Sequence, residues 1–170
     1  MSSESARANA AAEARFRIDD ANSRQRAVKV MALDARSEAV VRHLARGRWG
    51  GASFFTASAF APAPSTDARF SMASWLSDLT GRTKDLVDEL DTADLVAMVA
   101  TVGENSQAAS VIGEACSMKR VTTIAFVLSS PSTPQEALSR TLAQLRPWTL
   151  MLVVAGDEDY IAEVLTALRA

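Results

Sequence analysis

The fold class of this chain is decided by the stretch ADLVAMVATVGENSQAASVIGEAC, residues 93–116. Its first part, residues 94–101, is a continuous apolar run, which is typical of a strand covered on both faces. Its last part carries apolar residues at helical spacing, namely Ala108, Val111, Ile112, Ala115 and Cys116. A buried strand that leads directly into an amphipathic helix is the repeating unit of a parallel α/β sheet.

The same unit recurs on both sides of this stretch. We predict strands within residues 27–34, 51–58, 121–129 and 148–156, and helices within residues 37–49, 84–90, 133–147 and 157–168. Thr133 is expected to cap the third of these helices with Pro134 in its first turn, and Asp157 to cap the last. A third edge strand is predicted at residues 73–76, with a short helix as the alternative. The order predicts an α/β fold, a three-layer αβα sandwich with a mostly parallel, Rossmann-like sheet of five or six strands.

Composition divides the chain into two parts. Residues 1–26 are rich in Ala, Ser and Arg and contain Phe16 and Ile18 as their large apolar residues, so we predict a flexible N-terminal tail. Whether this tail orders on assembly is left open. The remaining residues, 27–170, are long and apolar enough to form a single α/β domain with one substantial core.

Charge and apolar run lengths limit the classes of partner. The formal net charge is -2, which makes nucleic acid an unlikely partner because nucleic-acid binding favours a concentrated basic surface. The longest apolar runs fall far short of the roughly 20 residues that a membrane span needs. Cys116 is the single cysteine and fits a reducing compartment. We therefore expect a cytoplasmic protein without membrane association.

The predicted topology indicates where a ligand would bind. In open parallel sheets the binding crevice lies at the carboxyl ends of the strands. Thr56 and Ser58 lie at the end of the second strand, and the side chains that we predict to bind a ligand lie at or just after the ends of the other strands. These candidates are Asp34, Arg36, Thr101, Gly103, Glu104, Asn105, Ser106, Ser129 and Ser130.

The turn TVGENS, residues 101–106, has two interpretations. Free N–H groups at a helix start can receive an anion, and Gly103 would let the backbone approach it closely. Against a phosphate, the turn has a single glycine and Glu104 would repel the charge. The second interpretation is an ordinary turn between strand and helix, with Asn105 or Ser106 as the helix cap.

Two stretches of this sequence resemble the N-terminal Rossmann-like domain of FtsZ and tubulin-like GTPases. They are AVKVMALDARSEAVVRHLARGRWGGASFFTAS, residues 27–58, and TKDLVDELDTADLVAMVATVGENSQAASVIGEACSMKRVTTIAFVL, residues 83–128. In that family an acidic helix is followed by "AD" and an apolar strand, then by a signature of the form GGGTGTG, and then by a helix that opens with two alanines. Here the signature is degenerate, because residues 101–107 read TVGENSQ and keep Gly103 alone. The resemblance implies the sheet topology of a nucleotide-binding domain that has lost GTP.

Other chemistry-bearing residues are isolated. His43 is the single histidine, so neither a metal site nor a Ser-His-Asp triad is predicted. Cys116 lies on the apolar stripe of its helix and is interpreted as a core thiol. The acids at residues 157–159 are explained by the helix dipole. The sequence predicts no metal and leaves any cofactor unknown.

Two functional hypotheses follow. The first is a non-catalytic module that binds a small molecule or nucleotide, or that assembles as a homodimer through apolar residues around the loop, Phe60, Phe70 and Trp75. The alternative is an enzyme that acts on a nucleotide or a phosphorylated small molecule at the carboxyl edge of the sheet, with Glu104 as its general base.

Overall fold

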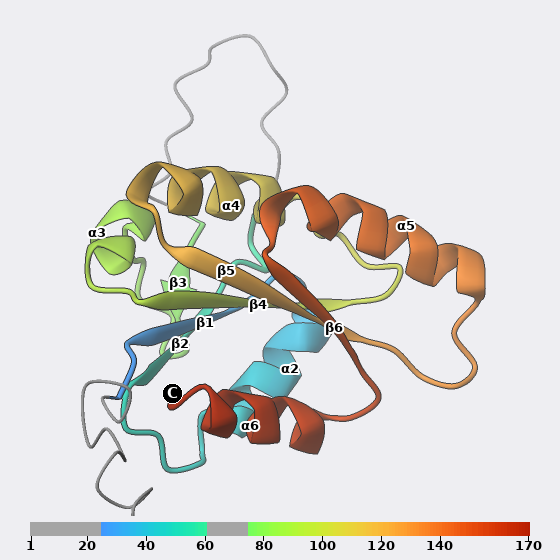
Figure 1. Ribbon diagram of the computed structural model, residues 1–170, viewed down its shortest axis with the longest axis horizontal. Helices are drawn as coiled ribbons and strands as arrows, with labels where there is room; N and C mark the ends of the chain where they lie inside the picture. The colour runs from blue at the N-terminus through green and yellow to red at the C-terminus, as the bar shows by residue number, and fades with distance from the viewer. Residues whose placement is uncertain (1–24, 61–74) are drawn as a thin grey trace, which may run out of the picture.

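A computed structural model describes residues 25–60 and 75–170 of the chain (Figure 1). The sheet has six strands in the order β3-β2-β1-β4-β5-β6. Five of them are parallel neighbours: β1 Val28–Ala32, β2 Ala52–Thr56, β4 Leu95–Thr101, β5 Thr122–Leu128 and β6 Met151–Ala155. The edge strand β3 Ser77–Asp78 runs antiparallel to β2. The predicted α/β fold with a mostly parallel, Rossmann-like sheet is confirmed.

Helices cover both faces of the sheet. In Figure 1, α3 Leu86–Asp91, α4 Ala108–Lys119 and α5 Gln135–Leu145 lie on one face, and α2 Ala35–Leu44 and α6 Glu158–Ala167 lie on the other. A short 3-10 helix, η2 Arg146–Trp148, leads from α5 towards β6. These helices and the sheet between them make the three layers that the alternating sequence pattern predicts.

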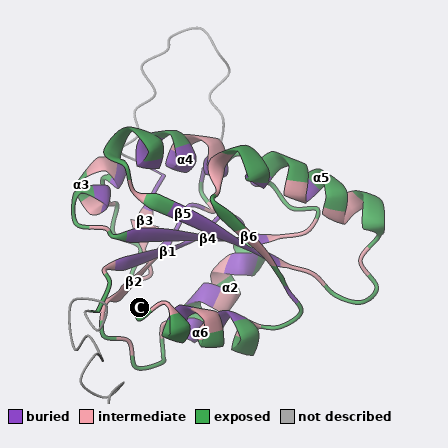
Figure 2. Ribbon diagram, in the orientation of Figure 1, coloured by how far each residue is buried: buried purple, intermediate pink, exposed green. Residues whose placement is uncertain are grey.

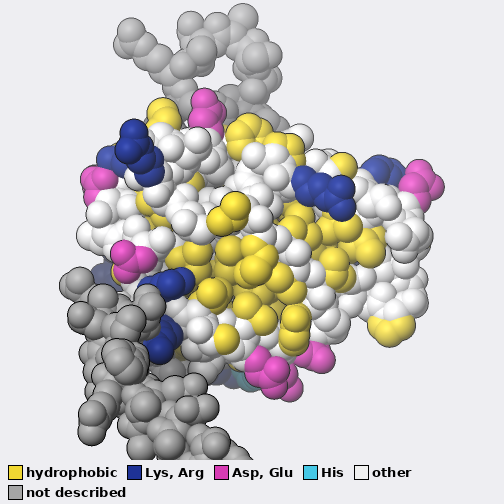
Figure 3. All heavy atoms as spheres, in the orientation of Figure 1, with side chains coloured by type: hydrophobic (Ala, Val, Ile, Leu, Met, Phe, Trp, Pro, Cys, Tyr) yellow, Lys and Arg dark blue, Asp and Glu magenta, His cyan; other side chains and the backbone are white. Residues whose placement is uncertain are grey.

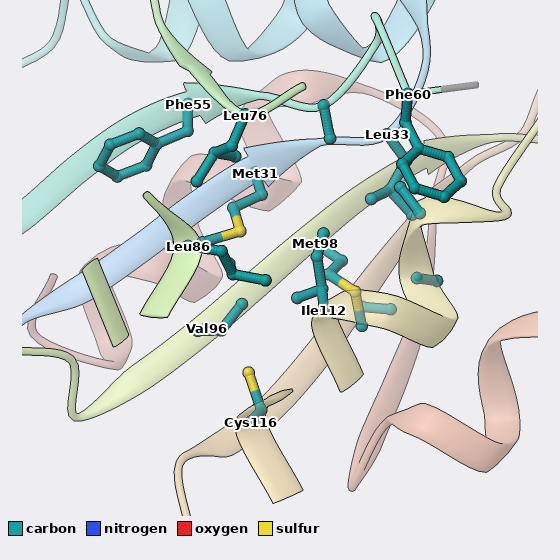
Figure 4. Packing of buried hydrophobic residues seen from close by; sticks show 14 of the residues in the cluster. Met31, Leu33, Phe55, Phe60, Leu76, Leu86, Val96, Met98, Ile112 and Cys116 are labelled. Atoms are coloured by element: carbon teal, nitrogen blue, oxygen red, sulfur yellow. The ribbon is translucent and has the colours of Figure 1, made fainter. Parts of the chain in front are cut away.

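Each face of the sheet has its own apolar core. Every residue of β1 is buried, and so is every residue of β4 except the last, which Figure 2 shows as a continuous purple centre. On the α3 and α4 side, Met31 and Met98 of the sheet point towards Leu86 and Ile112 of the helices (Figure 4). The buried apolar run of β4 therefore places this strand, and the turn that follows it, in the middle of the molecule.

Three local predictions need correction. The third strand lies at Ser77–Asp78 instead of residues 73–76, because Trp75 and Leu76 are drawn into the core next to it. Thr133 does not cap α5: its hydroxyl accepts the Ser130 N–H, and Pro134 stands in the extended conformation one residue before the helix. The helix α4 begins after Gln107, so neither Asn105 nor Ser106 is its N-cap residue.

Some predictions fall on residues that lie outside the described ranges. These are the tail up to residue 24, and Phe70 with most of the predicted loop at residues 59–68. Arg26, at the end of the predicted tail, donates its N–H to the carbonyl of Arg169 at 3.0 Å. Within the described residues no helix is both long enough and apolar enough to cross a membrane.

Candidate functional site

A cavity lies where the strand order reverses direction. The chain leaves β1 through α2 on one face of the sheet and leaves the neighbouring strand β4 through α4 on the other face, so the two loops diverge. The cavity between them has a volume of about 200 Å³ and is lined by Leu33, Asp34, Ala35, Ser58, Phe60, Glu104, Asn105 and Ala108. We call this space the switch-point crevice.

Asp34 joins the two strands that flank the crevice. It is the N-cap of α2, where its Oδ1 accepts the Ser37 N–H at 2.8 Å and the Ser37 hydroxyl accepts the Asp34 N–H. Its Oδ2 accepts the Thr101 N–H at 2.8 Å, and Oδ1 also accepts the Thr101 hydroxyl at 3.0 Å. Because both carboxylate oxygens are engaged by the protein, Asp34 tethers β1 to β4 and only its remaining lone pair is available to a ligand.

The turn at Gly103 uses its own N–H groups. Gly103 has a φ of +83°, a conformation that favours glycine. Its N–H donates to the Thr141 hydroxyl on α5 at 3.2 Å, and the Gln107 N–H donates to Oδ1 of Asn105 at 2.9 Å. The Glu104 N–H donates to the Thr101 carbonyl. These three N–H groups of the turn are therefore bound by protein acceptors and are not available to a phosphate.

One ion pair spans the mouth of the crevice. Nε of Arg36 on α2 lies 3.3 Å from Oε1 of Glu104 in the turn after β4. The Arg36 side chain is 75% exposed and that of Glu104 is 41% exposed. An exposed pair of this kind contributes about 0–1 kcal/mol, so an entering ligand can separate the two side chains at little cost.

A second cavity adjoins the first on the α5 side of Glu104. It has a volume of about 310 Å³ and is lined by Gly103, Glu104, Ala137, Arg140, Thr141 and Gln144. Ser106 is buried behind it, with its hydroxyl donating to Oε1 of Gln144 at 2.7 Å. Glu104 is thus shared by two adjacent spaces that together match the size of ordinary small-molecule sites.

The remaining predicted residues lie elsewhere. Ser129 donates its N–H to the Ala155 carbonyl at the end of the neighbouring strand, and Ser130 bonds within the turn that precedes α5. Neither lines the two cavities beside Glu104. The structure therefore brings Asp34, Glu104 and Asn105 together and places Ser129 and Ser130 outside their cluster.

A polar network closes the β2 side of the crevice. Oε2 of Glu38 accepts the hydroxyls of Thr56 at 2.8 Å and Ser58 at 2.5 Å, and its Oε1 accepts from the Arg42 guanidinium. Burial acts to raise the pKa of Glu38, but these hydrogen bonds, with Ser58 first among them, outweigh it and lower that pKa. Glu38 is therefore an ionised anchor that fixes the Ser58 hydroxyl at the crevice wall.

Two reactive residue types lie away from the crevice. His43 on α2 contacts Glu158 on α6, with 2.6 Å between Nδ1 and Oε1. Cys116 is fully buried on α4, and burial raises the pKa of its thiol to about 12. Across residues 25–60 and 75–170, no group of three or more His, Cys, Asp or Glu side chains could hold a metal ion.

Some of the residues that line the two cavities beside Glu104 are not predicted from the sequence. Phe60 lies beside Leu33 at the carboxyl end of the sheet (Figure 4), and its sequence neighbourhood, rich in Ala and Pro, indicates only a loop. Arg140 and Gln144 come from α5, which follows a different strand. No motif marks these residues, because their positions depend on how α5 packs across the end of the sheet.

The fold and the crevice define a doubly wound α/β domain of the Rossmann type, with strand order 3-2-1-4-5-6. No model of a known protein family matches the chain, and no curated protein matches it. The chemistry of the crevice is therefore the basis for a functional proposal.

Proposed function

We propose that this protein is a non-catalytic module that binds a small organic molecule in the switch-point crevice. One observation carries the proposal: a cavity at the reversal of strand order is lined by both polar and apolar side chains. This position is the general ligand site of open α/β sheets, and a few convergent polar groups on an apolar wall are typical of small-molecule sites.

The described lining of the crevice favours binding over catalysis. A general base works best when its pKa lies near the operating pH, whereas hydrogen bonds keep Glu38, the acceptor of the Ser58 hydroxyl, at a lowered pKa. Asp34 is engaged by Ser37 and Thr101. Among the described lining residues this leaves Glu104, whose exposed ion pair with Arg36 separates easily, without a second free carboxylate beside it. A single carboxylate favours binding over the alternative, an enzyme with Glu104 as base.

The lining favours an uncharged ligand with hydrogen-bond donors over a phosphate. Asp34 caps α2 with its own carboxylate, so negative charge already occupies the helix N-terminus where a dinucleotide would place its pyrophosphate. Glu104 adds a second carboxylate, and Asn105 can donate or accept. Leu33, Phe60 and Ala108 supply apolar contacts, which would suit a flat ring. A nucleoside, with ribose hydroxyls as donors and a planar base, has this chemistry.

A ligand screen tests the proposal. Thermal unfolding of the full chain is followed with nucleosides, with the matching mononucleotides and with dinucleotides, and each hit is confirmed by calorimetric titration. We expect a nucleoside to raise the melting temperature, because a ligand that binds the folded state stabilises it. Asn105→Ala should abolish the shift, while Gln107→Ala, an exposed position two residues further on, should keep it.

The same screen distinguishes the alternatives. A larger shift with the phosphorylated form than with the nucleoside would favour the enzyme hypothesis and overturn the ligand class proposed here. A hit that survives Asn105→Ala would place the ligand outside the crevice. No stabilisation by any compound of the screen would leave this class of ligand without support and contradict the proposal.

The proposal also includes a homodimer and a cytoplasmic location. Phe60 and Trp75, which the sequence predicts to take part in assembly, are buried in the core. Apolar side chains along β6, Leu150 above all, remain exposed instead and support assembly with a further copy of the chain. The resemblance to FtsZ and tubulin-like GTPases stays a prediction. The N–H groups of Gly103 and Gln107 already donate to side chains of the protein, which agrees with a turn that has lost GTP.

A further inference from the structure

The two edges of the sheet are protected very differently. At one edge, β3 is two residues long, and Asp78 in it accepts hydrogen bonds from Thr80 and Arg82. At the other edge, β6 is five residues long and reads MLVVA, without a charge or a proline. Natural sheets usually shorten or charge an exposed edge strand, because unpaired N–H and C=O groups recruit another strand. The β6 edge has neither protection.

The surface around β6 is apolar as well. Leu150 is 82% exposed, Val154 44% and Met151 38%, and Tyr160 on the adjoining helix α6 is 46% exposed. Figure 3 shows apolar side chains gathered at the centre of the face on which β6 lies in Figure 1. We call this surface, formed by Leu150, Met151, Val154 and Tyr160, the β6 patch. Large contiguous apolar patches are uncommon on monomers and mark interaction surfaces.

Among the described residues, one side of the β6 main chain has no partner strand. The Ser129 N–H of β5 donates to the Ala155 carbonyl, and the two strands are parallel in a fixed register. Because hydrogen-bonding direction alternates along a strand, Val153 and Ala155 direct their main-chain groups to β5. Leu152 and Val154 direct theirs to the open side of the sheet. The outward-facing main-chain groups of β6 are therefore those of Leu152 and Val154, which lie one residue on either side of Val153.

We propose that a second copy of this chain pairs with the β6 edge, antiparallel and about a two-fold axis at Val153. In that arrangement Leu152 faces Val154 of the partner subunit, and facing residues of this type exchange both main-chain hydrogen bonds. The two sheets become one continuous sheet, and the same patch is buried on both copies, as a two-fold interface requires. The inference rests on the self-assembly in the proposed function and is independent of the ligand.

Charge placement supports a second copy as the occupant. Arg146 precedes β6 and Asp159 follows it, both are exposed, and neither forms an ion pair with a described residue. Antiparallel pairing of two β6 strands brings the start of one strand to the end of the other. Each Arg146 therefore approaches the acidic start of α6 in the partner subunit, which complements its charge.

The flanking helices enlarge the contact beyond the strand. A stable dimer buries about 800 Å² on each subunit, which a single strand edge does not supply. Leu142 on α5 and Val164 on α6 are half-buried next to the sheet, on opposite faces of it. The β6 patch thus continues onto both helices, so that pairing at the edge also brings these apolar surfaces together.

The first experiment measures the mass of the full chain in solution by sedimentation equilibrium over a range of concentrations. We expect a dimer for the wild type and a monomer for Val154→Lys, because a lysine on an edge strand opposes pairing. Met118→Lys is the matched control, since Met118 is also apolar and 69% exposed but lies on α4, and it should remain dimeric. Circular dichroism of each variant checks that it is folded.

The second experiment tests the symmetry axis by crosslinking. Antiparallel residues without mutual hydrogen bonds have Cα atoms about 4.5 Å apart, which lies within the reach of a disulfide. Val153→Cys should therefore form a covalent dimer under mild oxidation, and a reducing agent should reverse it. The wild type is the control, because Cys116 is fully buried and should not crosslink.

The outcomes distinguish the proposed β6 interface from the more general proposal of a homodimer. A wild type that is monomeric at every concentration overturns both proposals. A dimer that persists in Val154→Lys overturns the β6 interface alone, and it then points to another surface or to residues 1–24 as the cover of the patch. A dimer lost in Val154→Lys without crosslinking of Val153→Cys overturns the proposed axis.

Discussion

The substitution Asp34→Asn tests whether one carboxylate holds the crevice together. Asp34 is 6% exposed, and both of its oxygens accept hydrogen bonds, from the Ser37 N–H and from Thr101. An amide keeps one acceptor oxygen and turns the other into a donor that faces an N–H. In either orientation one main-chain N–H loses its acceptor, and the remaining bonds lose their charge.

The expected cost follows from these contacts. A hydrogen bond to a charged group contributes about 1.5–3 kcal/mol, and a donor left unsatisfied costs about 1–3 kcal/mol, with overlap between the two. We therefore expect Asp34→Asn to lower the free energy of unfolding by about 3 kcal/mol. For a chain of this length, that corresponds to a fall in melting temperature of about 6–12 °C.

The assay is urea unfolding followed by circular dichroism. We expect the substitution to lower the urea concentration at the midpoint and to leave unchanged the slope of the unfolding free energy against urea concentration. Asp157→Asn is the control, because Asp157 caps α6 through a single bond to the Tyr160 N–H and asparagine caps a helix equally well. The control should stay close to the wild type. A loss of less than about 1 kcal/mol in Asp34→Asn, within the range of a single neutral hydrogen bond, would refute the tether.

Three further predictions concern packing and titration. Gly113→Ala should destabilise the fold, because its Cβ would lie 2.5 Å from Cβ of Trp148, and overpacking costs about 1–3 kcal/mol against a smaller gain in helix propensity. Thermal unfolding measures this loss. Gly113→Ala should cost less in a Trp148→Gly background, which lacks the clashing Cβ. Cys116, whose pKa burial raises to about 12, should resist a thiol reagent at pH 8 until denaturant is added. As the pH rises from about 8.5 towards 12, the thiol ionises in the unfolded chain before it ionises in the folded one, so the free energy of unfolding should fall. Cys116→Ala should remove this dependence on pH. Burial acts to raise the pKa of Glu38, but hydrogen bonds, led by the one from Ser58, outweigh it and lower that pKa. The stabilisation by ionised Glu38 is therefore present above its unfolded pKa and is lost as the pH falls through the folded value. The stability of Glu38→Gln should accordingly depend less steeply on pH in acid unfolding.

The fold class could be predicted because strands and helices alternate plainly in the sequence, whereas the order of the strands in the sheet comes from the structure alone. The buried runs that became β4 and β5 require helices on both faces, and parallel strands end at the same edge of the sheet. That reasoning is enough to bring Asp34 near Glu104 and Asn105, which the structure places around one cavity. The function of these residues is not fixed by the same reasoning and stays a proposal.

Local rules failed where tertiary contacts compete with them. Trp75 and Leu76 are apolar enough to predict a strand, yet they are buried in the core, and the pairing with β2 falls on Ser77 and Asp78. Thr133 fits a helix cap by spacing, but its hydroxyl closes the preceding turn at Ser130. Similarly, Ser106 is turned towards Gln144 of α5 and does not line the switch-point crevice.

A nucleoside titration of the labelled full chain, followed by two-dimensional NMR, tests the central claim most directly. The claim is that the crevice between β1 and β4 binds the ligand. It predicts saturable shifts that are largest for the amides of Ala35, Asn105 and Ala108. Shifts concentrated instead at the cavity of about 340 Å³ beside Trp148, at the opposite end of the sheet, would contradict the claim.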